Sequence, residues 1–167
     1  MQPSGESMAA ASTSASPSDA AARRAWMAVL ARARPQALEA ALAARPDLPA
    51  YRLLRGPETG LVMVRGRAGG TGGRFNLGEM TVTRCTVATA TGYTGHAYVA
   101  GRDRRHAELA AVFDALLQDP GLAPALDREV VRPVAEELER RHAARAGKVA
   151  GTRVDFFTLV RGEDARE

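Results

Sequence analysis

Cysteine and long apolar runs are the two features that this sequence most clearly lacks. Cys85 is the single cysteine, so no disulfide can form within the chain, which is typical of a reducing compartment. No stretch reaches the roughly 18 consecutive apolar residues that a membrane-spanning helix requires. The first residues also lack the continuous apolar segment of a secretory signal. We therefore expect a cytoplasmic protein that makes no contact with membranes.

Lysine is almost absent as well, because Lys148 is the only lysine among 23 basic residues. Arginine forks match the oxygens of phosphate and carboxylate groups, which favours acidic or phosphate-bearing partners. An arginine- and alanine-rich composition also arises from genome composition alone. The net charge of +4 is small and spread along the chain, so the sequence does not indicate nucleic-acid binding.

The length of 167 residues predicts one domain and a tail. Residues 1–18 are rich in Ser, Ala and Pro, a composition that buries too little apolar surface to offset the entropy of ordering. We expect a disordered tail over residues 1–18 and a single α+β domain over residues 19–167.

Apolar spacing and turn residues predict the first half of this domain. Two short helices, beginning near Asp19 and at Pro35, form an αα-hairpin. Four short strands then follow in an antiparallel meander. A turn is expected at "RGPETG" (residues 55–60) and the clearest strand at "MTVTRCTVATA". Helices packed on such a sheet define the class α+β.

Three further elements complete the predicted fold. Asp103 caps a helix that runs to Gln118 and packs on the central strand "MTVTRCTV" through Phe113 and Leu116. A long polar helix begins at Pro133, and its thin apolar stripe is typical of a helix that is exposed or packed on another chain. The apolar segment "TRVDFFTLV" (residues 152–160) is expected to form a final strand.

The glycine-rich stretch "RAGGTGGRFNLGEM" leads into the central strand. Phosphate-binding loops of the Walker and Rossmann types open a helix, and the Walker type also needs a lysine. Neither type fits here, because a strand follows the glycines and no lysine is present. Two interpretations remain, a flexible hairpin connection and a nest of backbone amides that binds an anion.

Two residues of the central strand lie on opposite faces by strand alternation. Arg84 must find a partner or reach an edge, because an unpaired charge is costly among apolar neighbours. It either pairs with an acid such as Glu58 or Glu79, or meets a ligand or a partner chain. Cys85 is expected to be a buried structural thiol, since no obvious base is near it in the sequence.

The histidines are His96, His106 and His142, and they show none of the spacings of a zinc site. We therefore predict no metal site. No complete set of nucleophile, base and orienting group is visible either. The sequence accordingly favours a subunit of a larger assembly over an enzyme that is active alone.

Several long motifs resemble the PhnG family, a subunit of the bacterial carbon–phosphorus lyase system. They are "GGTGGRFNLGEMTVTR", "GHAYVAGRDRRHAELAAVFDALLQ" and "RVDFFTLVRGE", accompanied by "RRAWMAVLARA" and "ETGLVMVRGRAGGTG". The similarity runs in order and in spacing from about Arg23 to Glu163. Only the N-terminal tail has no recognisable counterpart.

The resemblance implies a role in making alpha-D-ribose 1-methylphosphonate 5-triphosphate from ATP and methylphosphonate, with displacement of adenine. It implies PhnH, PhnI and PhnL as partners, with nucleosidase chemistry in PhnI, and a core complex that also contains the radical iron–sulfur subunit PhnJ. ATP is then a substrate of the assembly, and no cofactor is expected on this subunit. No catalytic residue of this chain is implied. The alternative is a free-standing nucleotide- or phosphonate-binding module.

We expect the glycine- and arginine-rich edge to be where the chain meets its partners or an anion. Glycine allows another surface to approach the backbone closely, and arginine bonds carboxylate or phosphate in a bidentate manner. The candidate interface or anion-binding residues are Gly69, Gly70, Gly72, Gly73, Arg74, Arg84, Arg102 and His106.

Overall fold

The computed structural model describes residues 17–67 and 72–150. The elements in chain order are α1 (Pro17–Leu30), α2 (Pro35–Ala43), β1 (Tyr51–Gly66), β2 (Phe75–Thr89), β3 (Thr94–Ala100), α3 (Arg104–Leu116), α4 (Ala123–Leu126), a π-helical turn η2 (Asp127–Val131) and α5 (Arg132–Ala150). This confirms the predicted α+β class, the two short N-terminal helices and the long C-terminal helix. Most of the predicted tail (residues 1–18) and all of the predicted final strand (residues 152–160) lie outside the described residues.

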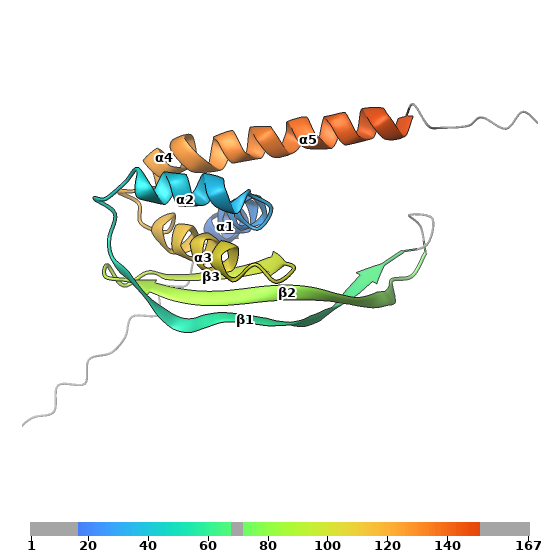
Figure 1. The fold of residues 1–167 in the computed structure, drawn as a ribbon, viewed down its shortest axis with the longest axis horizontal. Coiled ribbons are helices and arrows are strands. Elements are labelled where there is room, and N and C mark those ends of the chain that lie inside the picture. Colours follow the sequence, from blue (N-terminus) through green and yellow to red (C-terminus); the bar gives the residue numbers. More distant parts are fainter. Residues whose placement is uncertain (1–16, 68–71, 151–167) are drawn as a thin grey trace, which may run out of the picture.

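The sheet is an antiparallel meander in the order β1-β2-β3. The helices all lie on one of its faces, with α3 directly on the sheet and α2 and α5 beyond it (Figure 1). The prediction of a turn at residues 55–60 was wrong, because β1 runs through this stretch as one strand. Register shifts between Leu53 and Arg55 and between Arg55 and Glu58 accommodate it. The described sheet therefore has three strands where four short ones were predicted. Pro57 is tolerated because β1 is an edge strand, where a missing N–H removes no necessary ladder hydrogen bond.

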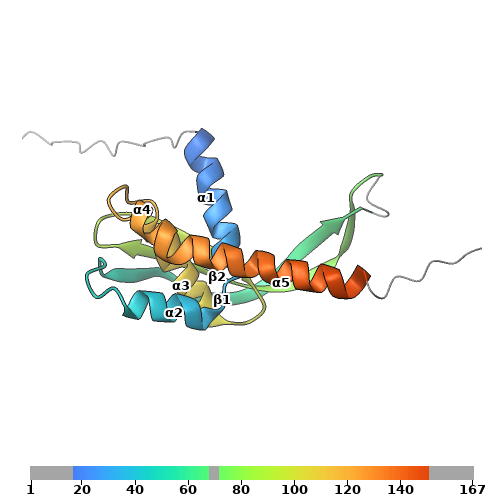
Figure 2. The ribbon, with the colours of Figure 1, turned by 90° about the horizontal axis from the view of Figure 1, so that it is seen from above.

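The strands β1 and β2 extend well past the end of β3. The last residue of β3, Ala100, pairs with Val82, so in the sheet residues 75–81 of β2 pair only with residues 61–66 of β1. These two segments form a two-stranded arm, which projects beyond the helices that lie on the sheet (Figures 1 and 2). The helix α5 also projects in this direction.

The core lies between the sheet and α3, which is buried along most of its length. Phe113 and Leu116 are fully buried and pack in one cluster with Val87 and Val99 of the sheet, as the sequence predicts. Gly95 lets β3 approach α3 closely, because a Cβ at this position would overlap the Ala111 carbonyl oxygen and the Ala115 amide nitrogen. The predicted cap is also present, since Asp103 accepts a hydrogen bond from the backbone N–H of His106.

A buried carboxylate joins three elements of the body. The side chain of Asp114 on α3 accepts hydrogen bonds from Arg23 Nε (3.1 Å) and Nη2 (2.7 Å), Trp26 Nε1 (2.9 Å) and the backbone N–H of His96 (2.8 Å). Arg23 Nη2 also donates to the carbonyl oxygen of Thr94. These contacts attach α1 to α3 and to the outer edge of β3.

Replacing Asp114 with Ala should lower the free energy of unfolding by about 3–5 kcal/mol, the usual cost of breaking a buried ion pair. The change leaves the donors of Trp26 and His96 without their acceptor. Chemical denaturation of the purified variant measures the effect. The matched control is Asp127→Ala, which removes an equally short but exposed pair with Arg132 (2.7 Å) and should cost at most about 1 kcal/mol. An equal loss of unfolding free energy in the two variants would show that the buried network stabilises the fold no more than an exposed ion pair does.

Candidate functional site

The structure distributes the predicted site residues along the arm and the body and does not gather them into one cluster. Gly72, Gly73 and Arg74 lie exposed beside the tip of the arm, and Gly72 has a φ of 92°, which favours glycine. Gly69 and Gly70 lie outside the described residues. Arg102 is exposed just after the end of β3, at the base of the arm.

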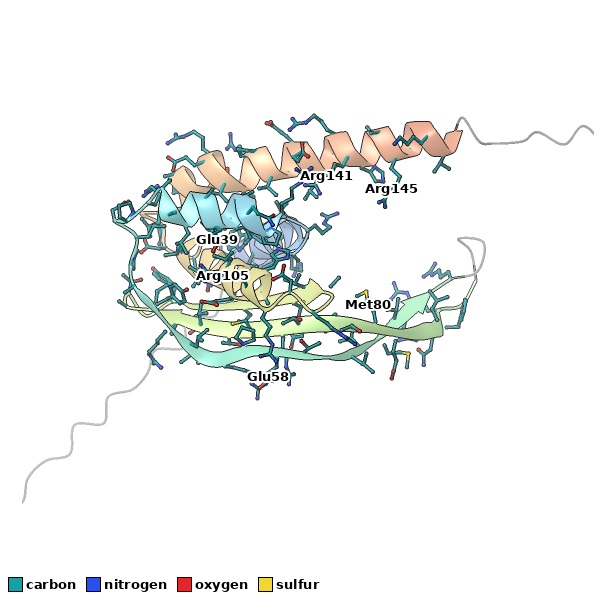
Figure 3. All side chains as sticks on the ribbon, viewed as in Figure 1. Glu39, Glu58, Met80, Arg105, Arg141 and Arg145 are labelled. Atoms are coloured by element: carbon teal, nitrogen blue, oxygen red, sulfur yellow. The ribbon has the colours of Figure 1, made fainter. Side chains whose placement is uncertain are left out.

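Arg84 lies in the body of the sheet and is paired with an acid, as one of the two interpretations predicted. Its Nη2 and Nε donate to Glu58 Oε2 at 3.1 Å and 3.3 Å. Glu58 projects from the face of the sheet that carries no helix (Figure 3). The hydrogen bonds with Glu58 are the main cause that raises the pKa of the Arg84 guanidinium, and the neighbouring Tyr98 adds to it. Both members of the pair are about half exposed, so they remain accessible to a partner.

His106 lies inside the body, away from the arm. Its side chain is buried, and its Nε2 lies 2.8 Å from the carbonyl oxygen of Leu30. This contact fastens the end of α1 to the beginning of α3 and satisfies a helix-terminal carbonyl group. The geometry therefore gives His106 a structural contact and does not present it to an external anion.

Cys85 is buried among the residues that face α3. Its thiol donates to the carbonyl oxygen of Arg55 at 3.4 Å, and burial is the main cause that raises its pKa. The nearest histidine along the sheet, His96, has its ring nitrogen Nδ1 3.2 Å from Thr86 Oγ1 instead. A protonated, enclosed thiol fits the predicted structural role. In the described part of the chain, no three His, Cys, Asp or Glu side chains are grouped so that they could hold a metal ion.

The arm carries large apolar side chains that the sequence reasoning did not single out. Leu61 and Leu77 are 63% and 62% exposed. The exposed apolar residues of the arm are Leu61, Met63, Phe75, Leu77 and Met80. Concentrated exposed apolar surface is a mark of protein interaction sites. The available signals were the continuous apolar run at residues 61–64 and the alternation of Phe75 and Leu77 with non-apolar residues. Strands with a covered face show such patterns as well.

Comparison with known proteins identifies similar sequences over most of the chain. Residues 21–162 match a family described as "Phosphonate metabolism protein PhnG". The chain is also 49% identical over 144 residues to a Rhizobium meliloti (strain 1021) protein, "Alpha-D-ribose 1-methylphosphonate 5-triphosphate synthase subunit PhnG". The similarity covers 86% of this chain and 92% of that relative. Among the residues described, no helix is both long and apolar enough to cross a membrane.

The buried thiol of Cys85 leads to a prediction about its reactivity. Alkylation by iodoacetamide at pH 8 should be at least about tenfold slower in the folded chain than in guanidinium chloride, because thiolate is the reactive form and both burial and the raised pKa suppress it. The rate in the folded chain should still be rising at a pH where that of the unfolded chain has levelled off. Mass spectrometry of quenched samples measures both rates. Rapid modification of the folded chain at pH 7 would contradict the structural role.

Proposed function

Since this chain belongs to the PhnG family of phosphonate metabolism proteins, we propose that it is a subunit of alpha-D-ribose 1-methylphosphonate 5-triphosphate synthase. The observation that carries the proposal is the 49% identity to the Rhizobium meliloti subunit over 92% of that protein. The assembly works in phosphonate degradation in the cytoplasm. Its further members are PhnH, PhnI and PhnL, with PhnJ in the core complex.

The reaction of the assembly exchanges one substituent at the anomeric carbon of ATP. An oxygen of methylphosphonate forms a bond to C1′ of the ribose, while the bond from C1′ to N9 of adenine breaks. The leaving adenine retains the electron pair of this bond and takes up a proton. Such a step needs a group that stabilises the departing base and a site that orients the phosphonate.

This chain contributes to the reaction without supplying its catalytic groups. Two of its side chains with suitable chemistry, Cys85 and His106, are engaged in the core with the carbonyl oxygens of Arg55 and Leu30. These contacts support a non-catalytic role. We place the nucleosidase chemistry in PhnI and expect no cofactor on this subunit. ATP is a substrate of the complete assembly.

The arm is the surface through which we expect the subunit to join its partners. Its apolar side chains are exposed in the isolated chain, and burial of such side chains is the main source of association free energy. Arg74 beside the tip and Arg102 at the base flank this apolar surface and supply charged groups for a polar rim. This arrangement extends the sequence-based expectation, which rested on the glycines and arginines of the same edge.

Substituting Leu61→Glu and Leu77→Glu together should abolish co-purification with the partner subunits while leaving the fold intact. Both side chains are exposed in the isolated chain, so the charges cost little there, whereas at an interface they weaken binding roughly 30-fold or more. Affinity purification of the co-expressed subunits measures the loss. The matched control is Leu53→Glu with Leu54→Glu, two exposed leucines at the other end of β1, and it should assemble normally. If the arm variant assembles as well as the control, the arm is not the interface.

The isolated chain should release no adenine from ATP and methylphosphonate, whereas a mixture with PhnH, PhnI and PhnL should release it. Chromatographic detection of adenine measures the reaction. A mixture that lacks only this chain serves as the control and should lose activity. Full activity without this chain would contradict the proposed function, and activity of the chain alone would contradict its non-catalytic role.

A further inference from the structure

A basic groove lies between the turn after α1 and the middle of α5, outside the arm and away from the buried network. Its lining residues are Arg32, Leu138, Glu139, Arg141, His142 and Arg145, and its cavity volume is about 430 Å³. Ligand sites are commonly of this size, roughly 300–1,000 Å³. Arginines approach the groove from two segments that are distant in sequence, so its charge is a product of the fold.

The arginines of α5 are placed so that they act together. Arg141 and Arg145 are four residues apart and therefore project from the same face of the helix, about 6 Å apart along its axis. Figure 3 shows both of them pointing from α5 toward the side on which the sheet lies. Arg32, from the turn after α1, is the third arginine that lines the groove. Side chains so arranged can bind successive anionic groups of one extended ligand.

The terminal nitrogens of these arginines are available. Arg32 and Arg141 are each fixed through Nε, which donates to the carbonyl oxygen of Ala28 at 2.8 Å and to Glu137 Oε1 at 3.0 Å, respectively. In the described part of the chain, the Nη groups of both arginines make no hydrogen bond, and Arg145 pairs with no acid. Two of the three guanidiniums are thus positioned by one nitrogen and free to bind a ligand with the others.

The groove and the adjoining part of α5 carry a net positive charge. Glu137 interacts with Arg34, Arg140 and Arg141 at once, so a single carboxylate faces three guanidiniums. The segment Arg140–Ala150 carries Arg140, Arg141, Arg145 and Lys148 and no acidic residue. Glu139 is the one carboxylate that lines the groove. The negative end of the α5 dipole opposes an anion only weakly, because Arg145 lies more than a turn before Ala150.

We propose that this groove binds a polyphosphate chain, as carried by a nucleoside triphosphate or a sugar 5-triphosphate. The ligand class rests on the proposed function, since the relative's name specifies a 5-triphosphate product. The groove itself rests on the guanidiniums of Arg32, Arg141 and Arg145. The alternative occupant is an acidic segment of a partner protein. The experiment below distinguishes the two.

The test measures binding of inorganic tripolyphosphate to the full-length chain by isothermal titration calorimetry at low ionic strength. The wild-type chain should bind one tripolyphosphate saturably. A chloride salt titrated at equal ionic strength should give no saturable binding. The double variant Arg141→Gln/Arg145→Gln should bind about tenfold more weakly or worse, because each arginine makes charge-assisted hydrogen bonds. Glu139→Gln should bind roughly 1.5- to 5-fold more tightly, because it removes an exposed like charge.

The matched control is Arg52→Gln/Arg128→Gln, which removes two exposed arginines that pair with no acid in the described part of the chain. It should retain wild-type affinity. Absence of saturable binding to the wild type, or an equal loss in both double variants, would overturn the proposal. Loss of partner co-purification by Arg141→Gln/Arg145→Gln with unchanged tripolyphosphate binding would assign the groove to an acidic protein surface instead.

Failure of this inference and failure of the proposed function give different results. If the chain binds tripolyphosphate as expected but the complete subunit mixture releases adenine without it, the groove is established and the synthase role fails. If the mixture requires the chain while the isolated chain does not bind tripolyphosphate, the synthase role stands and this inference fails. In an assembled mixture, Arg141→Gln/Arg145→Gln should raise the KM for ATP more than it lowers kcat.

Discussion

The position of the helices over the sheet depends on one desolvated carboxylate. Burying Asp114 is unfavourable unless its oxygens are fully bonded, and the four donors from Arg23, Trp26 and His96 meet that requirement only when α1, α3 and β3 are all in place. Apolar packing around Phe113 supplies most of the driving force. The carboxylate adds specificity, because all of its donors can reach it in only one arrangement of α1, α3 and β3.

The same network has an effect on the sheet edge. The strand β3 is an edge strand, and the N–H of His96 and the carbonyl oxygen of Thr94 are bonded by Asp114, Arg23 and Gln118 instead of a further strand. An open edge can pair with a strand of another chain. Because these edge groups are already bonded, this part of β3 cannot do so. The exposed apolar arm and the outer half of α5 project from the body and remain available to partners. A body from which two elements project suits a subunit that is held between partners.

How much of the molecule could be predicted depended on whether the signal was local. The helix capped by Asp103, the central strand and the opposite faces of Arg84 and Cys85 follow from periodicity within a few residues. The continuity of β1 was missed because proline and glycine at residues 56–60 normally indicate a turn. An edge strand tolerates them without a turn, and the sequence does not show that β1 is at the edge. Glu58 was one of two acids expected to pair with Arg84, since strand alternation limits the choice without fixing the register.

Contacts between residues that are distant in the sequence could not be predicted, because no local pattern indicates them. Asp114 and Arg23 are 91 residues apart, and only the tertiary fold shows that they meet. The same holds for Arg32 and the two arginines of α5, whose helix was predicted while the groove was not. Among the candidate residues, His106 was placed correctly on the helix. Its partner, the carbonyl oxygen of Leu30, lies 76 residues away at the end of α1, and no local pattern shows that the two meet.

The unequal length of the strands gives β2 two environments along its length. Amides at residues 83–87 lie between two neighbouring strands beneath α3, whereas those at residues 75–81 pair with one strand in the uncovered arm. Local opening free energies follow such differences in cover. Hydrogen–deuterium exchange should therefore run from slow to fast along a single strand, so the outer half of β2 is an intrinsic reporter whose amides slow down when another molecule covers the arm.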